Sequence, residues 1–93
     1  MSNPKRNDVL KPAKNGDDIG LVNDKDKKFF KLDKAFLDIW SLCDGKTKEE
    51  DIADNYFNMV KKSVKKDFKI DEKKFKNDVI YIINRLKKYG LVN

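Results

Sequence analysis

The stretch IWSLCDGKTKEEDIA, Ile39 to Ala53, decides the fold, because one helix ends and the next begins within it. Four apolar residues spaced at i, i+3, i+4 and i+7 mark one face of the first helix. They are Phe36, Ile39, Trp40 and Cys43. Asp33 is a good N-cap residue for this helix. Asp44 and Gly45 stop it, since glycine readily adopts the left-handed conformation that ends many helices. The stretch therefore predicts a helix–turn–helix joint.

A second helix is predicted to start at once, because Thr47 and Glu50 have the Thr-x-x-Glu spacing of a capping box. Its apolar face is predicted to be Ile52, Ala53, Tyr56, Phe57, Val60 and Val64. Residues 65–70 read as a connector. Asp71 then caps a third helix over residues 72–89, which Gly90 ends. Leu91 and Val92 are expected to tuck back as a short extended end.

Upstream of the helices, the chain has strand character interrupted by turns. The predicted strands are Val9 to Lys14, Ile19 to Asn23 and Lys28 to Leu32. NGDD at 15–18 and DKDK at 24–27 supply the turns, and Pro12 confines the first strand to an edge or a strand end. Two hairpins in succession predict a three-stranded antiparallel meander. Residues 1–8 are polar and are expected to be a flexible tail, which leaves 9–93 as the domain.

Alternation along the third strand assigns its side chains to two faces. Phe30 and Leu32 are expected on one face, and Phe29 and Lys31 on the other.

The composition excludes several classes of enzyme. There is no histidine and only one cysteine, so Ser–His and Cys–His nucleophile pairs are absent and a transition-metal site of the usual kind is not expected. Cys43 shares the stripe of Trp40 and Phe36, so it is interpreted as a small buried hydrophobe; a reactive thiol is the alternative. We expect no enzymatic activity, no catalytic residue and no cofactor.

Charge is unevenly spread along the chain. Residues 1–60 hold 11 Lys and Arg against 12 Asp and Glu, whereas residues 61–93 hold 11 against 4. The excess of +6 therefore lies in the last third, which favours an acidic partner. A general bias toward lysine is the alternative, because 20 of the 22 basic residues are lysine.

From Lys11 to Val92, the order of these features resembles the PqqD-like family, named for pyrroloquinoline quinone biosynthesis protein D. The matching positions are Leu32-Asp33, Ile39-Trp40, Asp44-Gly45, Thr47, Ile52-Ala53, Asp78-Val79 and Gly90-Leu91. The resemblance implies an α+β, winged-helix-like domain with a three-stranded antiparallel sheet followed by three helices. Asp33 stands where asparagine is common, and the basic segment 57–69 is longer than the usual connector, so partner contacts near that segment need not follow the family.

The resemblance also implies a function without catalysis. Such domains bind the leader of a ribosomally synthesised precursor peptide and present it to a maturase, often a radical-SAM enzyme. An extended leader can add as a further strand to an unpaired sheet edge. The resemblance places the leader against the third strand and third helix. The site residues predicted on that basis are Phe29, Phe30, Lys31, Leu32, Lys76, Ile80, Ile83, Asn84 and Lys87.

Within the third helix, one arc is predicted to face the core: Phe75, Val79, Ile82, Ile83, Leu86 and Tyr89. Ile80 lies beside this arc, with Lys76 and Lys87 as a basic rim, which suits a leader with apolar anchors and acidic flanks. Packing of Ile80 under the first helix or the sheet is the alternative.

Two other functions stay open. A winged-helix nucleic-acid binder fits the helix–turn–helix and the basic third helix, but the scarcity of arginine makes nucleic acid the less favoured partner. The other open function is a structural adaptor that docks a partner protein without selecting a leader peptide. The longest apolar run, Val79 to Ile83, is far shorter than a membrane span, and the N-terminus lacks a secretory pattern. We therefore predict a cytoplasmic monomer or weak dimer that does not bind membranes.

Overall fold

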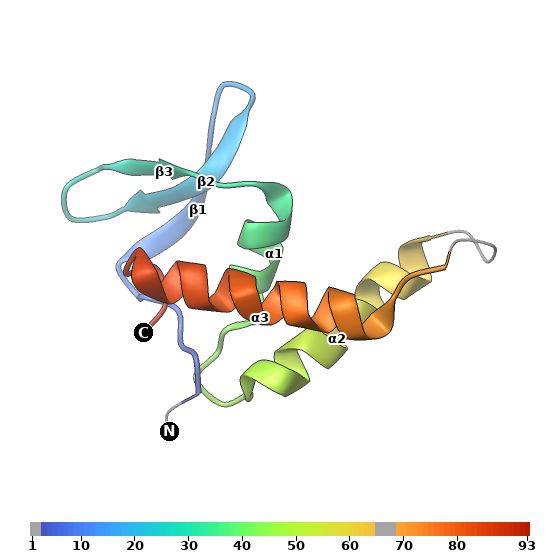
Figure 1. Ribbon diagram of the computed structural model, residues 1–93. Coiled ribbons are helices and arrows are strands. Elements are labelled where there is room, and N and C mark those ends of the chain that lie inside the picture. Colours follow the sequence, from blue (N-terminus) through green and yellow to red (C-terminus); the bar gives the residue numbers. More distant parts are fainter. Residues whose placement is uncertain (1–2, 65–68) are drawn as a thin grey trace.

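The computed structural model describes residues 3–64 and 69–93. In chain order it contains β1 (Leu10–Asn15), β2 (Asp18–Asn23), β3 (Phe29–Lys31), α1 (Lys34–Leu42), α2 (Glu49–Ser63) and α3 (Glu72–Lys88). The expected α+β architecture, a three-stranded antiparallel sheet followed by three helices, is confirmed (Figure 1). Residues 65–68 of the expected connector lie outside the described residues, so the basic segment 57–69 is described only in part.

The sheet is a meander with the order β1-β2-β3, so β1 and β3 are its edges. Pro12 lies in β1 opposite Leu21, which confirms its edge position. The amide of Asp24 bonds to the carbonyl of Val9, and bonded pairs alternate in an antiparallel ladder. Pro12 therefore stands at a position whose backbone nitrogen points away from β2, where the missing N–H breaks no bond.

Gly20 lets β2 and β3 approach closely. A Cβ at this position would lie 1.9 Å from the carbonyl oxygen of Phe30, so no larger residue fits without moving the strand. The need for glycine at this position comes from the neighbouring strand, so it cannot be recognised from the residues around Gly20 alone.

The expected helix ends are partly confirmed. Asp33 is the N-cap residue of α1, although its side chain makes no capping bond. The capping box predicted from Thr47 and Glu50 is wrong: Lys48 occupies the N-cap of α2, and no side chain caps it. The carboxylate of Asp44 instead accepts hydrogen bonds from the backbone amides of Lys46 and Thr47 and from the Thr47 hydroxyl. Asp44 therefore organises the turn that Thr47 was expected to organise.

Both ends of α3 are as predicted. Asp71 accepts a hydrogen bond from the amide of Lys74, as an N-cap residue does. At the other end, Gly90 has φ +74°. The amide of Leu91 bonds to the carbonyl of Leu86, and that of Gly90 to the carbonyl of Lys87, which is the Schellman arrangement. This ending turns Leu91 and Val92 back into the core, as expected.

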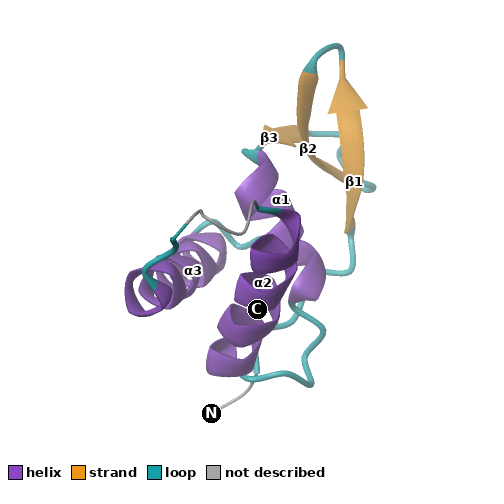
Figure 2. Cartoon of the chain, turned by 90° about the vertical axis from the view of Figure 1, so that its right-hand side faces the viewer, coloured by secondary structure: helices purple, strands orange, loops and turns teal. Residues whose placement is uncertain are grey.

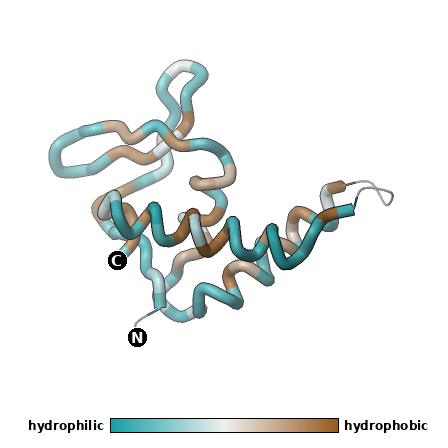
Figure 3. Tube along the Cα trace, viewed as in Figure 1, coloured by the Kyte–Doolittle hydropathy of each residue, from teal (hydrophilic) through white to brown (hydrophobic). Residues whose placement is uncertain are grey.

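The core lies where the three helices meet the sheet. Figure 2 shows the sheet standing at one end of the helical layer, and in Figure 3 the turn between β2 and β3 and the beginning of α3 are hydrophilic. The buried apolar residues of the sheet, the helices and the C-terminal end form one cluster: Leu10, Leu21, Ile39, Trp40, Cys43, Ile52, Ala53, Val79, Ile83, Leu86, Leu91 and Val92. One core thus fixes the position of the sheet relative to α3.

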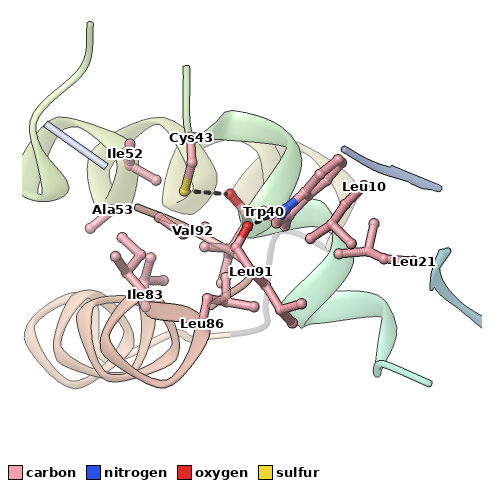
Figure 4. Packing of buried hydrophobic residues seen from close by; sticks show 12 residues of the cluster. Leu10, Leu21, Trp40, Cys43, Ile52, Ala53, Ile83, Leu86, Leu91 and Val92 are labelled. Atoms are coloured by element: carbon pink, nitrogen blue, oxygen red, sulfur yellow. Dashed lines mark hydrogen bonds between the residues drawn. The ribbon is translucent and has the colours of Figure 1, made fainter. Parts of the chain in front are cut away.

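Two hydrogen bonds stand out inside this core (Figure 4). The indole Nε1 of Trp40 donates to the carbonyl of Leu91 at 3.0 Å, and the Cys43 thiol donates to the carbonyl of Ile39 at 3.3 Å. Cys43 has no exposed surface, as expected for a small hydrophobe. Burial raises the pKa of its thiol to about 11.

The N-terminal segment differs from the expected flexible tail. Pro4 is buried, and the backbone of residues 4–7 bonds both to the α1–α2 turn and to the C-terminal end. Arg6 donates to the carbonyl of Cys43, and Asn7 to that of Leu91. Polar composition suggested fraying, but backbone amides and carbonyls pair regardless of their side chains.

Candidate functional site

The outer edge of β3 is open to solvent. The amides of Leu32 and Asn23 bond to the carbonyls of Ile19 and Lys28, so Phe30 of β3 and the flanking residues 28 and 32 direct their polar groups toward β2. By the same alternation, the backbone N–H and C=O of Phe29 and Lys31 point outward. Within residues 3–64 and 69–93, no strand pairs with this edge.

A groove lies beside this edge. It has a volume of about 250 Å³ and is lined by Lys31, Leu32, Asp33, Phe36 and Tyr89. These residues come from the end of β3, the start of α1 and the C-terminal cap of α3. Figure 2 shows that the edge of β3 and helix α3 face the same side of the molecule. A chain paired with β3 would therefore lie against the C-terminal half of α3.

The side chains of β3 are divided between two faces as the sequence predicts. Phe30 lies opposite Leu21, whose side chain is fully buried, so both lie on the core-facing side. Phe30 nevertheless keeps 36% of its surface exposed, because it stands at the margin of the core. Phe29 lies opposite Val22 on the other face. A strand added to β3 would meet apolar side chains on both faces.

Helix α3 has two flanks, and the two lysines predicted on it lie on the flank away from β3. Lys76 forms ion pairs with Asp54 of α2 at 2.6 Å and with Glu72 at 2.9 Å. Lys87 forms one with Glu49 of α2 at 2.5 Å. Figure 1 shows α3 lying across α1 and α2, with the sheet on the side of α1. Lys76 and Lys87 therefore join α3 to α2 rather than line the groove.

The positions of the other predicted residues of α3 follow from this orientation of the helix. Ile80 lies between Lys76 and Lys87 on the same face of the helix, and it is half-buried against the core. Ile83 is fully buried, whereas Asn84 is exposed one turn beyond Ile80. The structure thus brings together the predicted residues of β3 but does not bring these residues of α3 to them.

Electrostatics agree with the position of Lys76. Hydrogen bonds from its ammonium to the carboxylates of Asp54 and Glu72 raise the pKa of Lys76. Its charge is already balanced by two carboxylates of its own chain. A further acidic group would have to displace them.

Tyr89, Phe36 and Asp33 are the groove residues that the sequence analysis did not assign to the site. Tyr89 and Phe36 were assigned to core-facing stripes, and Phe36 is indeed half-buried. Tyr89 keeps 50% of its surface exposed, so its place in the predicted core arc is wrong. Helix α3 ends at Lys88, and Tyr89 is its C-cap residue. The only sequence signal that marks Tyr89 is its position as a large aromatic residue directly before Gly90, the residue that ends the helix.

Other kinds of site have no support within the described ranges. Residues 3–64 and 69–93 contain no cluster of three or more potential metal ligands. In the same ranges, no helix combines the length and apolar character needed to cross a bilayer.

Comparison with known proteins gives one family and two solved structures. The family described as "Coenzyme PQQ synthesis protein D (PqqD)" matches residues 19–92. The structure "TbiB1 in Complex with the TbiA(beta) Leader Peptide" is 21% identical, with a TM-score of 0.63, over 96% of this chain and 94% of that one. "Lasso peptide synthetase B1 complexed with the leader peptide" is 11% identical, with a TM-score of 0.64, over 98% of each chain. The comparison with curated proteins gave no match.

Proposed function

The chain belongs to the PqqD family, and from that premise we propose that it is a non-catalytic domain that binds the leader of a ribosomally synthesised precursor peptide. The leader adds as a strand to the outer edge of β3, and the domain presents it to a modifying enzyme. Both solved structures of similar fold are complexes with a leader peptide, which supports this proposal.

The single observation that carries the proposal is the open edge of β3 beside the groove. Phe29 and Lys31 direct two N–H and two C=O groups outward, which is the pattern that an added strand needs. Main-chain bonds of this kind hold a peptide without regard to its sequence. Selection must therefore come from the neighbouring side chains.

Those neighbouring side chains are mostly apolar. Leu32, Phe36 and Tyr89 line the groove, the last of them from the C-cap of α3. Phe30 exposes part of its ring on the same face of the sheet. Alternate residues of an added strand point to one face, so apolar residues at every second position of the leader would enter this groove.

The partner enzyme is proposed to be a radical-SAM maturase, the type that the family resemblance implies. The absence of histidine fits a carrier whose partner performs the chemistry. A cytoplasmic monomer, or a weak dimer through β3, fits this role. In the dimer the second copy would occupy the edge that the leader needs, so leader binding would release the monomer.

Nuclear magnetic resonance provides the direct test. The ¹⁵N-labelled chain is titrated with synthetic peptides that correspond to the N-terminal halves of products of short reading frames neighbouring its gene. We expect the largest amide shifts at Phe29, Lys31 and Tyr89, with new slow hydrogen exchange at Phe29 and Lys31. Shifts confined to α2, or no saturable binding by any peptide, would refute strand addition.

A nucleic-acid ligand is distinguished in the same experiment. A DNA or RNA duplex would perturb lysines without protecting the amides of β3, and its affinity would fall steeply with salt. The ion pairs of Lys76 and Lys87 with α2 leave α3 with fewer free cations than its sequence suggests, which disfavours this function.

A further inference from the structure

We propose that Arg85, held between Tyr81 and Tyr89, reads a carboxylate of the bound peptide, so that the preferred leader carries an aspartate or glutamate opposite the C-terminal half of α3. This inference rests on the proposed function and adds to it the chemistry of one leader position. The three residues, called the α3 aromatic–arginine cluster below, are spaced four apart along the helix and so lie on one face.

Geometry fixes the guanidinium within this cluster. It lies 5.1 Å from the ring centre of Tyr89 and 6.0 Å from that of Tyr81. A nitrogen of Arg85 also donates a hydrogen bond to the Tyr89 hydroxyl at 2.5 Å. Stacking on aromatic faces holds arginine in one orientation, so less side-chain freedom is lost when it binds a ligand.

The cluster adjoins the groove through one of its residues, because Tyr89 lines the groove together with Lys31 and Leu32. Around the helix, Arg85 lies on the opposite side from Lys76 and Lys87, whose ion pairs define the flank facing α2. Arg85 is therefore directed to the flank where the proposed strand would lie.

Arg85 has unused capacity to donate. Within residues 3–64 and 69–93, the carboxylate ion pairs involve lysines, and none involves Arg85. A guanidinium has five N–H donors in a planar fork that matches a carboxylate. The Tyr89 hydroxyl accepts one of them and keeps its own proton to donate. The two residues thus offer converging donors to an acidic side chain.

The charge distribution favours the same occupant. The cations predicted to contact an acidic leader, Lys76 and Lys87, are balanced by carboxylates of this chain. Lys31 is paired with Asp18 at 3.3 Å on the outer face of the sheet. Arg85 is therefore a cation near the groove whose charge no carboxylate of the described residues balances.

A display selection tests this with the full chain and a library of short random peptides. We expect peptides selected on the wild type to combine alternating apolar residues with an enriched Asp or Glu at a fixed distance from them. On Arg85→Gln, binders should still appear but that acidic enrichment should vanish. Arg85→Lys keeps the positive charge but loses the planar guanidinium, so the acidic enrichment should become weaker. Lys62→Gln, which removes a charge from the exposed end of α2, is the matched control and should leave it unchanged.

A second measurement starts with the wild-type chain and changes the peptide instead. One peptide selected on the wild type is compared with its Glu→Gln or Asp→Asn form, and we expect about a tenfold loss of affinity for the uncharged form. Against Arg85→Gln, the two forms should bind equally. Peptides that bind through β3 without an acidic preference, or that keep it on Arg85→Gln, would overturn this inference alone. A library that yields no binder to β3 would overturn the proposed function together with it.

Discussion

The ammonium of Lys76 on α3 lies 2.6 Å from the carboxylate of Asp54 on α2. This contact and the pair of Lys87 and Glu49 mark the side of α3 that turns toward α2. The opposite side is left facing β3, where Tyr89 joins the groove. The rotation of one helix about its axis therefore determines which side chains a bound peptide can meet.

Substitution of Lys76 tests whether the flank of α3 that faces α2 serves stability or peptide binding. Lys76→Glu places a third carboxylate beside Asp54 and Glu72, so we expect the midpoint of thermal unfolding to fall by a few degrees. Affinity for a selected peptide, measured well below that midpoint, should stay unchanged. Lys76→Gln is the milder control and should lower the midpoint less. A loss of peptide affinity in a fully folded Lys76→Glu variant would show that this flank contacts the peptide.

Proline at Lys31 tests strand addition directly. The N–H of this residue points outward, so Lys31→Pro removes a donor from the free edge and no bond from the β2–β3 ladder. We expect the affinity for a leader peptide to fall by about tenfold or more. One main-chain hydrogen bond to the peptide is lost, and the proline ring also obstructs the approach of the peptide backbone. Lys31→Ala retains the N–H and should bind within a factor of about two. Equal affinities of the two variants in calorimetric titration would argue against strand addition.

Gly20 supplies a test of the edge from within the sheet. In Gly20→Ala the new methyl would collide with the backbone of Phe30, so β3 must move away from β2. We expect a loss of about 2 kcal/mol or more in the free energy of unfolding and faster amide exchange at Leu32. Gly16→Ala, in the open turn between β1 and β2, meets no atom within 4 Å but places a side chain at φ +64°, so it shows the backbone cost of replacing a glycine without a collision and should leave exchange at Leu32 slow. Slow exchange at Leu32 in Gly20→Ala would contradict the close approach.

Trp40 ties the C-terminal end to α1. Trp40→Phe keeps most of the apolar ring but removes one of the two donors to the carbonyl of Leu91. The smaller volume of phenylalanine adds to this loss. We therefore expect the free energy of unfolding, measured in urea, to fall by about 2 kcal/mol. The amide of Asn7, which bonds to the same carbonyl, should exchange faster. An unchanged urea midpoint would show that the hydrogen bond contributes nothing measurable.

Cys43 should be inert in the folded protein. Burial raises the pKa of its thiol from the ordinary 9.0 to about 11, so the reactive thiolate is scarce at neutral pH. We expect iodoacetamide at pH 8 to modify the unfolded chain in urea much faster than the native one. Because the folded pKa is the higher one, the contribution to stability is complete below pH 9 and is lost as the pH rises toward 11. A Cys43→Ala variant should show a shallower loss of stability over that range, whereas rapid modification of the native protein would disprove the assignment.

The sequence by itself determined the elements, because their signals are local. Spacing at i, i+3, i+4 and i+7 identified the buried face of α1, and Asp71 and Gly90 marked the ends of α3 through their own backbone preferences. Turn residues at 15–18 and 24–27 gave the meander, and with it the free edge of β3. These features depend on residues within a few positions of one another.

Only the tertiary structure decided the shape of the site. Periodicity shows which residues of α3 share a face, but not which neighbour each face meets, because that depends on ion pairs and packing with residues about 20 to 40 positions away. For this reason Lys76, Ile80 and Lys87 were assigned to the site, whereas Tyr89 and Arg85 were not. Gly20 was overlooked for the same reason, since the backbone that excludes a larger side chain belongs to another strand.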